Sequence, residues 1–530
     1  MKDSKFIQRE PIAIIGTGCF FPGSQGFEEF WSFVKSGTDG ITDVPASHWN
    51  TDEFFNADPK QPDMVYSKTG GFLSPIKFHP GDYGIAPNNI EATDTSQLLG
   101  LLAAKQALEN AGYQSGVGEP AEGLRTWDRS RASVILGVTG TLELVIPLGA
   151  RLGHPRWRKA LKNAGVDDAT ANRVMDDIAE SYVPWQENSF PGLLGNVVAG
   201  RIANRLDLGG TNCVVDAACA SSLGAVHLAA LELWAGRSDM VITGGVDTFN
   251  DIFMFMCFSK TPALSPTGHS RPFDAEGDGT ALGEGLGLVV LKRLSDAEKA
   301  GDKIIAVLRS VGSSSDGKGG AVYAPKAEGQ MKALQAAYKE ANISVDTIEL
   351  VEAHGTGTKV GDATELSSLM KVYADRDGKS SPCAVGSVKS QIGHTKAAAG
   401  AAGLIKAAAA LFHKTIPPSI KVRKPLEGLL RGQSSFYLAS KKRPWVGNSS
   451  HPRRAAISAF GFGGSNFHCV LEEYKPEKLA PDWDGKVQIL ALSAPSREEL
   501  IQKLQALPSQ QSWSAWRKLC SQLRKIFQAD

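Results

Sequence analysis

The chain changes its hydrophobic periodicity abruptly around Cys219, and this change limits the folds that it can adopt. An apolar strand candidate at residues 213–215 runs directly into small residues and a single cysteine. Apolar residues then recur at helical spacing, at Leu223, Val226, Ala230 and Leu233. A strand that passes through a tight turn into a long helix is a building unit of α/β proteins.

The same turn suggests a chemical role for Cys219. The free N–H groups and the macrodipole at a helix N-terminus favour a thiolate over a thiol, so we expect Cys219 to be activated there. A nucleophile at the tip of a strand-to-helix turn is a recurring device of acyl-transfer enzymes. The alternative is a small buried hydrophobic residue, which is the usual role of a free cysteine.

Strand and helix patterns alternate along almost the whole chain. The predicted strands lie at residues 12–15, 133–138, 240–243, 286–291, 304–308, 348–352, 384–388, 455–459 and 469–472. The predicted helices lie at residues 95–111, 221–234, 327–341 and 397–413. This alternation predicts an α/β fold with layered sheets between helices.

Two regions differ from this pattern. Residues from about 142 to 186 are charged and helical, and we interpret them as an insertion between a strand and the segment that leads to Cys219. After Tyr474, a Lys-Pro-Glu-Lys-Leu-Ala-Pro stretch predicts a linker, which a strand at 487–492 and a helix at 497–507 follow. The sequence therefore predicts a main domain over residues 1–474 and a linker appendage over residues 475–530.

Composition argues against several classes of function. The net charge of +1 gives no electrostatic reason to expect nucleic acid or a membrane surface as a partner, and no apolar run reaches transmembrane length. The seven cysteines form no C-x-x-C pair, and the ten histidines form no H-E-x-x-H motif, so we expect no metal site. The scattered cysteines and a polar start unlike a signal peptide predict a reducing, cytoplasmic setting.

Two histidines lie in the same kind of context downstream of the cysteine. Each follows an apolar strand, has a glycine beside it and precedes a helical pattern: His354 in Glu-Ala-His-Gly-Thr-Gly-Thr, and His394 in Lys-Ser-Gln-Ile-Gly-His-Thr. A lone loop histidine is more often a solvated or packing residue. Two histidines in matching contexts indicate a shared site.

Two glycine-rich segments call for different interpretations. The segment Ala-Phe-Gly-Phe-Gly-Gly-Ser-Asn at residues 459–466 allows backbone N–H groups to point at a bound oxyanion, although a tight turn between two strands would use the same residues. The segment from Gly312 to Lys318 resembles a phosphate-binding loop, but Gly319 occupies the position of the required Ser or Thr. We therefore do not expect nucleotide binding.

Taken in order, these segments resemble the ketosynthase, or β-ketoacyl synthase, family. The match rests on Val-Asp-Ala-Ala-Cys-Ala-Ser-Ser-Leu around Cys219, the two histidine segments, the segment 459–466, and residues 11–23 and 271–287. It extends from about Pro11 to Tyr474. Each motif alone is weakly specific, whereas the ordered set is highly specific.

The resemblance implies the thiolase fold, with two similar mixed sheets in a five-layered α/β/α/β/α core and a short C-terminal linker appendage. Residues 475–530 resemble the start of the linker between the ketosynthase and acyltransferase regions of modular synthases. It implies an acyltransferase that condenses an acyl group on Cys219 with a malonyl-type unit, with loss of carbon dioxide, in polyketide or fatty acid chain elongation. As neutral imidazoles, His354 and His394 would donate hydrogen bonds to the thioester oxygen.

The family also assigns roles to other matching positions. Lys389 would lie behind the histidines with Glu365 near it, and the backbone N–H groups of Cys219 and Phe462 would bind an oxyanion. The Phe462 side chain would act as a gate between the two half-reactions. The residues implied in substrate binding are Thr356, Thr358, Phe258, Phe460, Gly463 and Gly464.

The resemblance implies substrates carried on the phosphopantetheine of acyl carrier protein and no cofactor bound to this domain. It implies a homodimer with adjacent acyltransferase or other synthase domains. The cysteine segment departs from the Thr-Ala-Cys-Ser-Ser-Ser of many modular ketosynthases, and with the insertion it is more similar to polyunsaturated fatty acid or glycolipid synthases. The alternative function is a catalytically silent, dimeric scaffold that binds acyl carrier protein.

Overall fold

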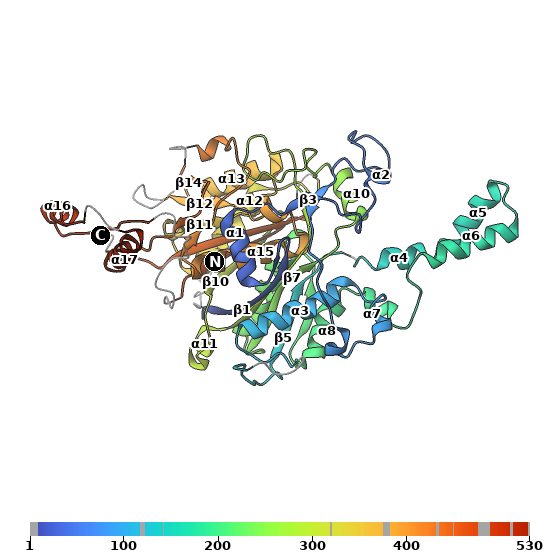
Figure 1. The fold of residues 1–530 in the computed structure, drawn as a ribbon, viewed down its shortest axis with the longest axis horizontal. Coiled ribbons are helices and arrows are strands. Elements are labelled where there is room, and N and C mark those ends of the chain that lie inside the picture. The colour runs from blue at the N-terminus through green and yellow to red at the C-terminus, as the bar shows by residue number, and fades with distance from the viewer. Residues whose placement is uncertain are drawn as a thin grey trace.

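A long mixed sheet forms the centre of the protein (Figure 1). The structure is a computed structural model that describes residues 9–116, 122–140, 142–318, 321–374, 382–430, 434–448, 450–474, 488–508 and 512–527. The sheet contains two sets of five strands. The first set is β1 (Ile12–Phe21), β5 (Ala132–Gly137), β6 (Asn212–Val215), β7 (Met240–Asp247) and β9 (Gly285–Arg293). The second set is β10 (Ala306–Ser315), β11 (Leu350–Glu352), β12 (Cys383–Gly386), β16 (Arg454–Gly461) and β17 (Ser465–Glu472).

The two sets have the same topology. Their spatial orders are β1-β9-β7-β5-β6 and β10-β17-β16-β11-β12, so each set reads 1-5-4-2-3 when its strands are numbered along the chain. In both sets the first two pairings are antiparallel and the last two are parallel. These are the two similar mixed sheets that we expected. They share one hydrogen-bonded path because β1 also pairs with β10 at residues 12–14.

Helices and sheet halves alternate in five layers. Helices α3 (Thr95–Asn110) and α8 (Asn196–Leu206) cover the outer face of the first half, and α12 (Ala327–Ala341) and α13 (Lys359–Val372) cover that of the second. Helices α9 (Ser221–Trp234) and α15 (Ala399–Phe412) lie between the halves. Because the strands are covered on both faces, their sequences are nearly continuous apolar runs.

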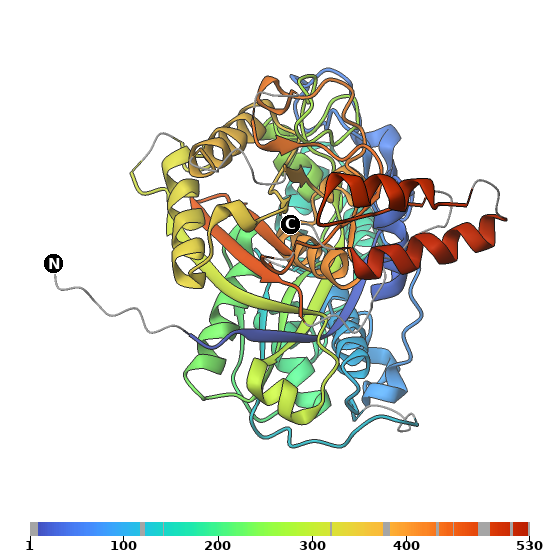
Figure 2. The ribbon, with the colours of Figure 1, turned by 90° about the vertical axis from the view of Figure 1, so that its left-hand side faces the viewer.

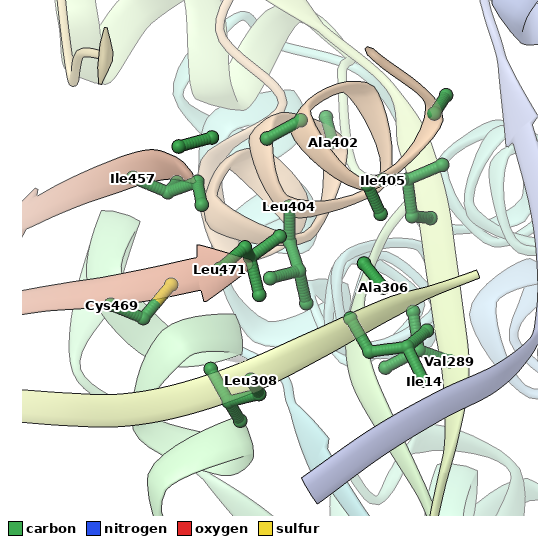
Figure 3. Packing of buried hydrophobic residues seen from close by; sticks show 14 of the residues in the cluster. Ile14, Val289, Ala306, Leu308, Ala402, Leu404, Ile405, Ile457, Cys469 and Leu471 are labelled. Carbon is green, nitrogen blue, oxygen red and sulfur yellow. The ribbon is translucent and has the colours of Figure 1, made fainter. Parts of the chain in front are cut away.

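Central helix α15 packs against strands of both halves. Figure 3 shows Leu404 and Ile405 among Leu308, Leu471 and Ile14. The small residues of α15 permit close contact with α9, since a Cβ at Gly400 would lie 2.7 Å from Leu223 Cγ. Apolar burial on this scale is the main stabilising contribution to a fold of this kind.

Two helical regions project from this core on opposite sides (Figure 1), and Figure 2 shows the C-terminal one facing the viewer. The segment 142–186 contains α4 (Val145–Ala150), α5 (His154–Asn163) and α6 (Asp168–Glu180), which form an arm on one side of the molecule. Helices α16 (Arg497–Gln505) and α17 (Trp513–Ile526) lie on the opposite side. Within the described ranges, no helix is long and apolar enough to cross a membrane.

The strand predicted at residues 487–492 is wrong for residues 488–492, and residue 487 lies outside the described residues. None of the described strands pairs with this segment. The carbonyl of Ile489 instead accepts a hydrogen bond from Arg524 Nη1 of α17 at 2.9 Å. An apolar segment needs a neighbouring sheet edge to become a strand, and a single sequence does not reveal whether one is within reach.

The remaining short elements connect these layers. They are β2 (Ser24–Gln25), α1 (Phe27–Ser36), β3 (Ile41–Asp43), α2 (Thr51–Phe54), β4 (Thr69–Gly71), α7 (Ser189–Leu193), α10 (Ile252–Lys260), β8 (Leu282–Gly283), α11 (Leu294–Ala300), α14 (Lys389–Ile392), β13 (Thr415–Ile416), β14 (Phe436–Tyr437) and β15 (Arg443–Pro444).

Candidate active site

Cys219 lies on a strained turn between β6 and α9. The turn is one 3-10 segment, Ala218–Ala220, and Ala218 adopts a left-handed conformation with φ of +49°. Side-chain oxygens hold this turn: Asp216 Oδ1 accepts the Ala218 N–H at 2.9 Å, and Ser221 Oγ accepts the Ala217 N–H at 2.9 Å. Because these contacts fix the backbone, the position of the thiol is also fixed.

The second half contains an equivalent turn before α15. It is the 3-10 segment Lys396–Ala398, and Lys396 has φ of +46°. The Lys396 N–H donates to Nδ1 of His394 at 3.1 Å, just as the Ala218 N–H donates to Asp216 in the first half. The two turns contact each other at the centre of the molecule. The same backbone arrangement thus presents a cysteine from one half and a histidine from the other.

His354 completes a pair of imidazoles. Its ring centroid lies 5.5 Å from that of His394, and the two ring planes are nearly perpendicular. Nδ1 of His354 accepts the Phe460 N–H at 3.4 Å, as Nδ1 of His394 accepts the Lys396 N–H. A neutral imidazole that accepts at Nδ1 carries its proton on Nε2, so both rings present an Nε2–H donor.

Burial keeps both imidazoles neutral. It lowers the pKa of His354 and of His394 well below the ordinary value, and the positive charge of Lys389 lowers both further. The desolvated cavity disfavours an imidazolium for the same reason that it would strengthen a hydrogen bond donated to a substrate oxygen.

Lys389 and Glu365 hold the backbone of His354 from two sides. Lys389 Nζ donates to the His354 carbonyl at 2.6 Å, while Glu365 accepts the N–H groups of His354 and Gly355 at 2.7 and 2.8 Å. Burial lowers the pKa of Lys389 and raises that of Glu365 to about 7. Both residues therefore act on His354 through its main chain.

Asp362 secures the next part of the same loop. Its carboxylate accepts the Phe273 N–H at 2.7 Å and the Gly357 N–H at 3.1 Å, and burial raises its pKa to about 6. Thr358 caps α13 by accepting the Gly361 N–H. The loop after β11 is thus fixed along its whole length.

A cavity of about 570 Å³ brings the predicted residues together. Cys219, His354 and His394 line it. It is also lined by Phe258, Thr356, Thr358, Glu365, Phe460, Phe462 and Gly464. Lys389 and Gly463 are not among its lining residues: Lys389 lies behind His354, and the Gly463 N–H donates to the Val322 carbonyl at 3.1 Å.

Phe462 stands where the glycine-rich segment approaches the cysteine turn. A Cβ at Gly461 would lie 2.1 Å from the Ala217 carbonyl oxygen, so a glycine is needed for this close approach. The backbone N–H of Phe462 hydrogen-bonds the Cys219 thiol and lowers its pKa, although other influences are larger. The Phe462 ring is 45% exposed and lies near the rings of Phe258 and Tyr323.

The expectation that Cys219 is a resting thiolate is wrong. Burial raises the pKa of its thiol to about 11, even though the charges of Lys389 and Lys396 oppose this shift. Desolvation disfavours the charged form, and it is the largest influence on the pKa of this thiol. The substrate-free cysteine is therefore protonated at neutral pH.

The residues that hold the glycine-rich segment were not predicted from the sequence. Asn466 Nδ2 donates to Asp316 Oδ1 at 2.7 Å, and the Asp316 N–H donates to the Gly464 carbonyl at 2.9 Å. Asp316 belongs to the segment that resembles a phosphate loop. Packing explains at least one of that segment's glycines, since a Cβ at Gly312 would lie 2.2 Å from the Ala333 carbonyl oxygen.

In the described part of the chain, no group of three or more His, Cys, Asp or Glu residues could hold a metal ion.

The family described as "Beta-ketoacyl synthase, N-terminal domain" matches residues 9–297, and "Beta-ketoacyl synthase, C-terminal domain" matches residues 305–423. The "Ketoacyl-synthetase C-terminal extension" matches residues 426–527. The three matches together reach across nearly the whole sequence.

Two curated proteins illustrate the similarity. The chain is 39% identical to a component of the polyunsaturated fatty acid synthase of Thraustochytrium, over 92% of this chain and 17% of that protein. It is 36% identical to a component of the phenolphthiocerol/phthiocerol polyketide synthase of Mycobacterium tuberculosis, over 91% of this chain and 24% of that protein. The chain thus spans about a quarter or less of these relatives.

Solved structures resemble the fold. The ketosynthase from module 6 of the bacillaene synthase of Bacillus subtilis 168 aligns with a TM-score of 0.74 and 32% identity, over 94% of this chain and 77% of that chain. A structure titled "PfaC Keto synthase-Chain length factor" aligns with a TM-score of 0.75 and 30% identity, over 88% and 48%. The expected thiolase fold is confirmed.

Proposed function

The chain belongs to the β-ketoacyl synthase family, and we propose that it condenses an acyl group held on Cys219 with a malonyl-type unit, releasing carbon dioxide. Members of this family are acyltransferases that act in polyketide and fatty acid synthesis. One observation carries the proposal: two neutral imidazoles, both protonated on Nε2, line the same cavity as the cysteine.

In the first half-reaction, Cys219 Sγ forms a bond to the acyl carbonyl carbon of a thioester, and the carbon–sulfur bond to the carrier breaks. The Cys219 proton leaves with the departing carrier thiol. The N–H groups of Cys219 and Phe462 bind the transient oxyanion in this scheme. Neither histidine needs to act as the base, since both carry their proton on the nitrogen that faces the cavity.

In the second half-reaction, the carboxylate of the malonyl unit leaves as carbon dioxide and its bonding electrons pass to the enolate. The Nε2–H groups of His354 and His394 stabilise the enolate oxygen, and each such donor typically contributes about 3–4 kcal/mol. The enolate carbon then attacks the acyl carbonyl carbon, and the carbon–sulfur bond to Cys219 breaks. Cys219 leaves as a thiolate and takes up a proton from solvent. Lys389 and Glu365 keep His354 in place throughout.

The alternative, a silent scaffold that binds acyl carrier protein, fits the site less well. A scaffold requires neither a buried nucleophile nor two imidazoles with matched tautomers. All three groups are present and face one cavity. The structure therefore favours an active enzyme.

We further propose that the substrates arrive on the phosphopantetheine arm of acyl carrier protein. The hydroxyls of Thr356 and Thr358 lie 2.9 Å apart in the cavity wall, where they can bond to the amides of such an arm. A homodimer is supported by β6, an edge strand whose hydrogen-bonded neighbour among the described strands is β5. The similarity to a polyunsaturated fatty acid synthase favours a role within a larger synthase.

Covalent loading tests the proposal directly. The protein is incubated with an acyl-loaded carrier protein and its peptides are analysed by mass spectrometry. We expect an acyl adduct on Cys219 and none on the half-buried Cys213 of the neighbouring strand. A chain without an adduct on Cys219 would be a scaffold rather than a condensing enzyme.

A further inference from the structure

A buried ion pair that this mechanism does not use supports the histidine turn. Lys396 Nζ lies 3.1 Å from Asp247 Oδ1 and donates to the Gly283 carbonyl at 2.9 Å. The side chains are 3% and 5% exposed. Removing two charges from water is costly, and the further hydrogen bonds to the Gly283 carbonyl and from the Ala397 N–H help to offset this cost.

The pair holds the backbone that sets the tautomer of His394. Lys396 is the left-handed residue of the turn, and its own N–H donates to His394 Nδ1. Asp247 Oδ2 accepts the N–H of the next residue, Ala397, at 3.2 Å. Asp247 at the end of β7 therefore secures Lys396 through both its side chain and the following peptide.

The cysteine turn is anchored in a different way from the histidine turn. There, Asp216 accepts the N–H of the left-handed Ala218 and is itself held by Thr139 Oγ1 at 2.7 Å and the Gly140 N–H at 3.0 Å. In the histidine turn an imidazole occupies the position of Asp216 and has no charge. The anionic acceptor comes instead from Asp247, on a different strand.

The pair also lies beside the nucleophile, because the 3-10 turn that carries Lys396 contacts the 3-10 turn that carries Cys219. The positive charges of Lys389 and Lys396 lower the pKa of Cys219, whereas the negative charge of Asp247 raises it. His354 and His394 share the cavity with the thiol but are neutral. Asp247 and Lys396 thus act on Cys219 with opposite signs.

We propose that Asp247 and Lys396 are a positioning pair, which holds the His394 turn with Nε2–H toward the substrate and balances charge beside Cys219. This inference rests on the proposed function, because it assigns the pair to the decarboxylation step. Neither Asp247 nor Lys396 lines the cavity, so the pair acts on the reaction through His394 and Cys219.

Two single variants, each of which neutralises one charge, test the proposed charge balance beside Cys219. We compare Lys396→Met, Asp247→Asn and the double variant by the rate at which iodoacetamide alkylates Cys219 at pH 8, resolved by peptide mass spectrometry. A lower thiolate fraction slows alkylation, so Lys396→Met should react about threefold more slowly and Asp247→Asn about threefold faster. The double variant should return to within about twofold of the wild type. Single variants that shift in the same direction would overturn the charge balance, since a purely structural pair predicts that result.

Decarboxylation of a malonyl-loaded carrier tests the proposed positioning of His394. In the double variant we expect kcat to fall about tenfold with KM within about twofold, because a misplaced donor weakens the transition state rather than binding. Wild-type kcat in the double variant would overturn the positioning role. If one single variant fails to fold, as judged by circular dichroism, the alkylation rate of the other still tests the charge balance, since a shift opposite to the one stated would overturn it, and the uncharged double variant tests the positioning role.

A second buried pair provides a matched control. Lys292 Nζ lies 2.7 Å from Asp302 Oδ2, and neither residue lines the cavity. Lys292→Met with Asp302→Asn should leave both the alkylation rate and kcat unchanged. Alkylation requires no substrate, so the charge test stands even if wild-type protein releases no carbon dioxide, a result that would contradict the proposed function and leave the charge balance intact.

Discussion

The two halves of the sheet have the same topology and contribute different chemistry. Each half carries a turn with a left-handed residue, followed by a central helix of 14 residues. In the first half the residue after the left-handed position is Cys219, and in the second it is Ala397. The position two residues before the left-handed residue is Asp216 in the first half and His394 in the second. A duplicated backbone therefore supplies the scaffold, and the residues at two of its positions place the nucleophile in one half and the donor His394 in the other.

Replacing the nucleophile is expected to have the largest effect and to separate the two halves functionally. In Cys219→Gln we expect condensation to fall at least about 10³-fold, because no thioester can form. Decarboxylation of a malonyl-loaded carrier should persist within about tenfold, since the donors of the second half remain. Product and carbon dioxide release are measured together. Cys213→Ser on the neighbouring strand is the control, and a Cys219→Gln enzyme that still elongates chains would reject this nucleophile.

Removing a donor should have the converse effect. His354→Ala and His394→Ala should each lower kcat for decarboxylation about 10²- to 10³-fold, because each removes one preorganised donor to the enolate oxygen. Acyl loading of Cys219, followed by mass spectrometry, should be affected less. His269→Ala changes an exposed histidine outside the cavity and should alter neither step. Unchanged carbon dioxide release in either variant would remove that histidine from its assigned role.

Glu365 holds the His354 loop of the second half and should make stability depend on pH. Burial raises its pKa from 4.5 to about 7, so the native state binds a proton that the unfolded chain has lost in this range. The stabilisation is fully present below about pH 4.5 and is lost as pH rises through 7. The total is about 3 kcal/mol in the free energy of unfolding.

Urea unfolding of wild type and Glu365→Gln between pH 4.5 and 8 measures this contribution. The difference in unfolding free energy between the two proteins should change by that amount, with the wild type losing stability relative to the variant as pH rises. Glu328→Gln, at an exposed glutamate of α12, should show no such change. Parallel pH curves for Glu365→Gln and wild type would contradict the assignment.

Glycine substitutions in the two central helices, α9 and α15, should have the smallest effects. A Cβ at Gly400 of α15 would lie 2.7 Å from Leu223 Cγ, whereas one at Gly224 of α9 would make ordinary contacts at 3.4 Å. We expect Gly400→Ala to lower the free energy of unfolding by about 2 kcal/mol through overpacking. Gly224→Ala should change it by less than about 1 kcal/mol, since the added methyl group makes only ordinary contacts and alanine has the better helix propensity. Equal effects in chemical denaturation would show that the two helices are packed alike.

Local patterns predicted much of the fold. Ten of the eleven proposed strands lie within or overlap strands of the sheet, and the helices proposed within the main domain at 95–111, 221–234, 327–341 and 397–413 correspond to α3, α9, α12 and α15. These elements are buried on both faces, so their apolar runs are long and uninterrupted. The failed strand at 488–492 belongs to the C-terminal region, where pairing depends on neighbours that a sequence does not reveal.

The site was predictable where a residue and its context are adjacent in the chain. Cys219, His354 and His394 each follow a strand, and the structure brings them into one cavity. Contacts between distant segments were not predictable, as between Asp247 and Lys396 or Asp316 and Asn466. The pKa of Cys219 was misjudged for the same reason, because a helix N-terminus can be identified in sequence whereas the depth of burial cannot.

The position of α15 between the halves has a consequence for synthesis of the protein. This helix fills the space between strands of both halves (Figure 3), and α9 packs against it. The ribosome completes α9 about 180 residues before it completes α15, which at typical elongation rates is about 10–40 s. Throughout this interval the apolar face of α9 lacks its partner. The nascent first half is therefore a substrate for chaperones, and slow translation between residues 234 and 412 would lengthen its exposure.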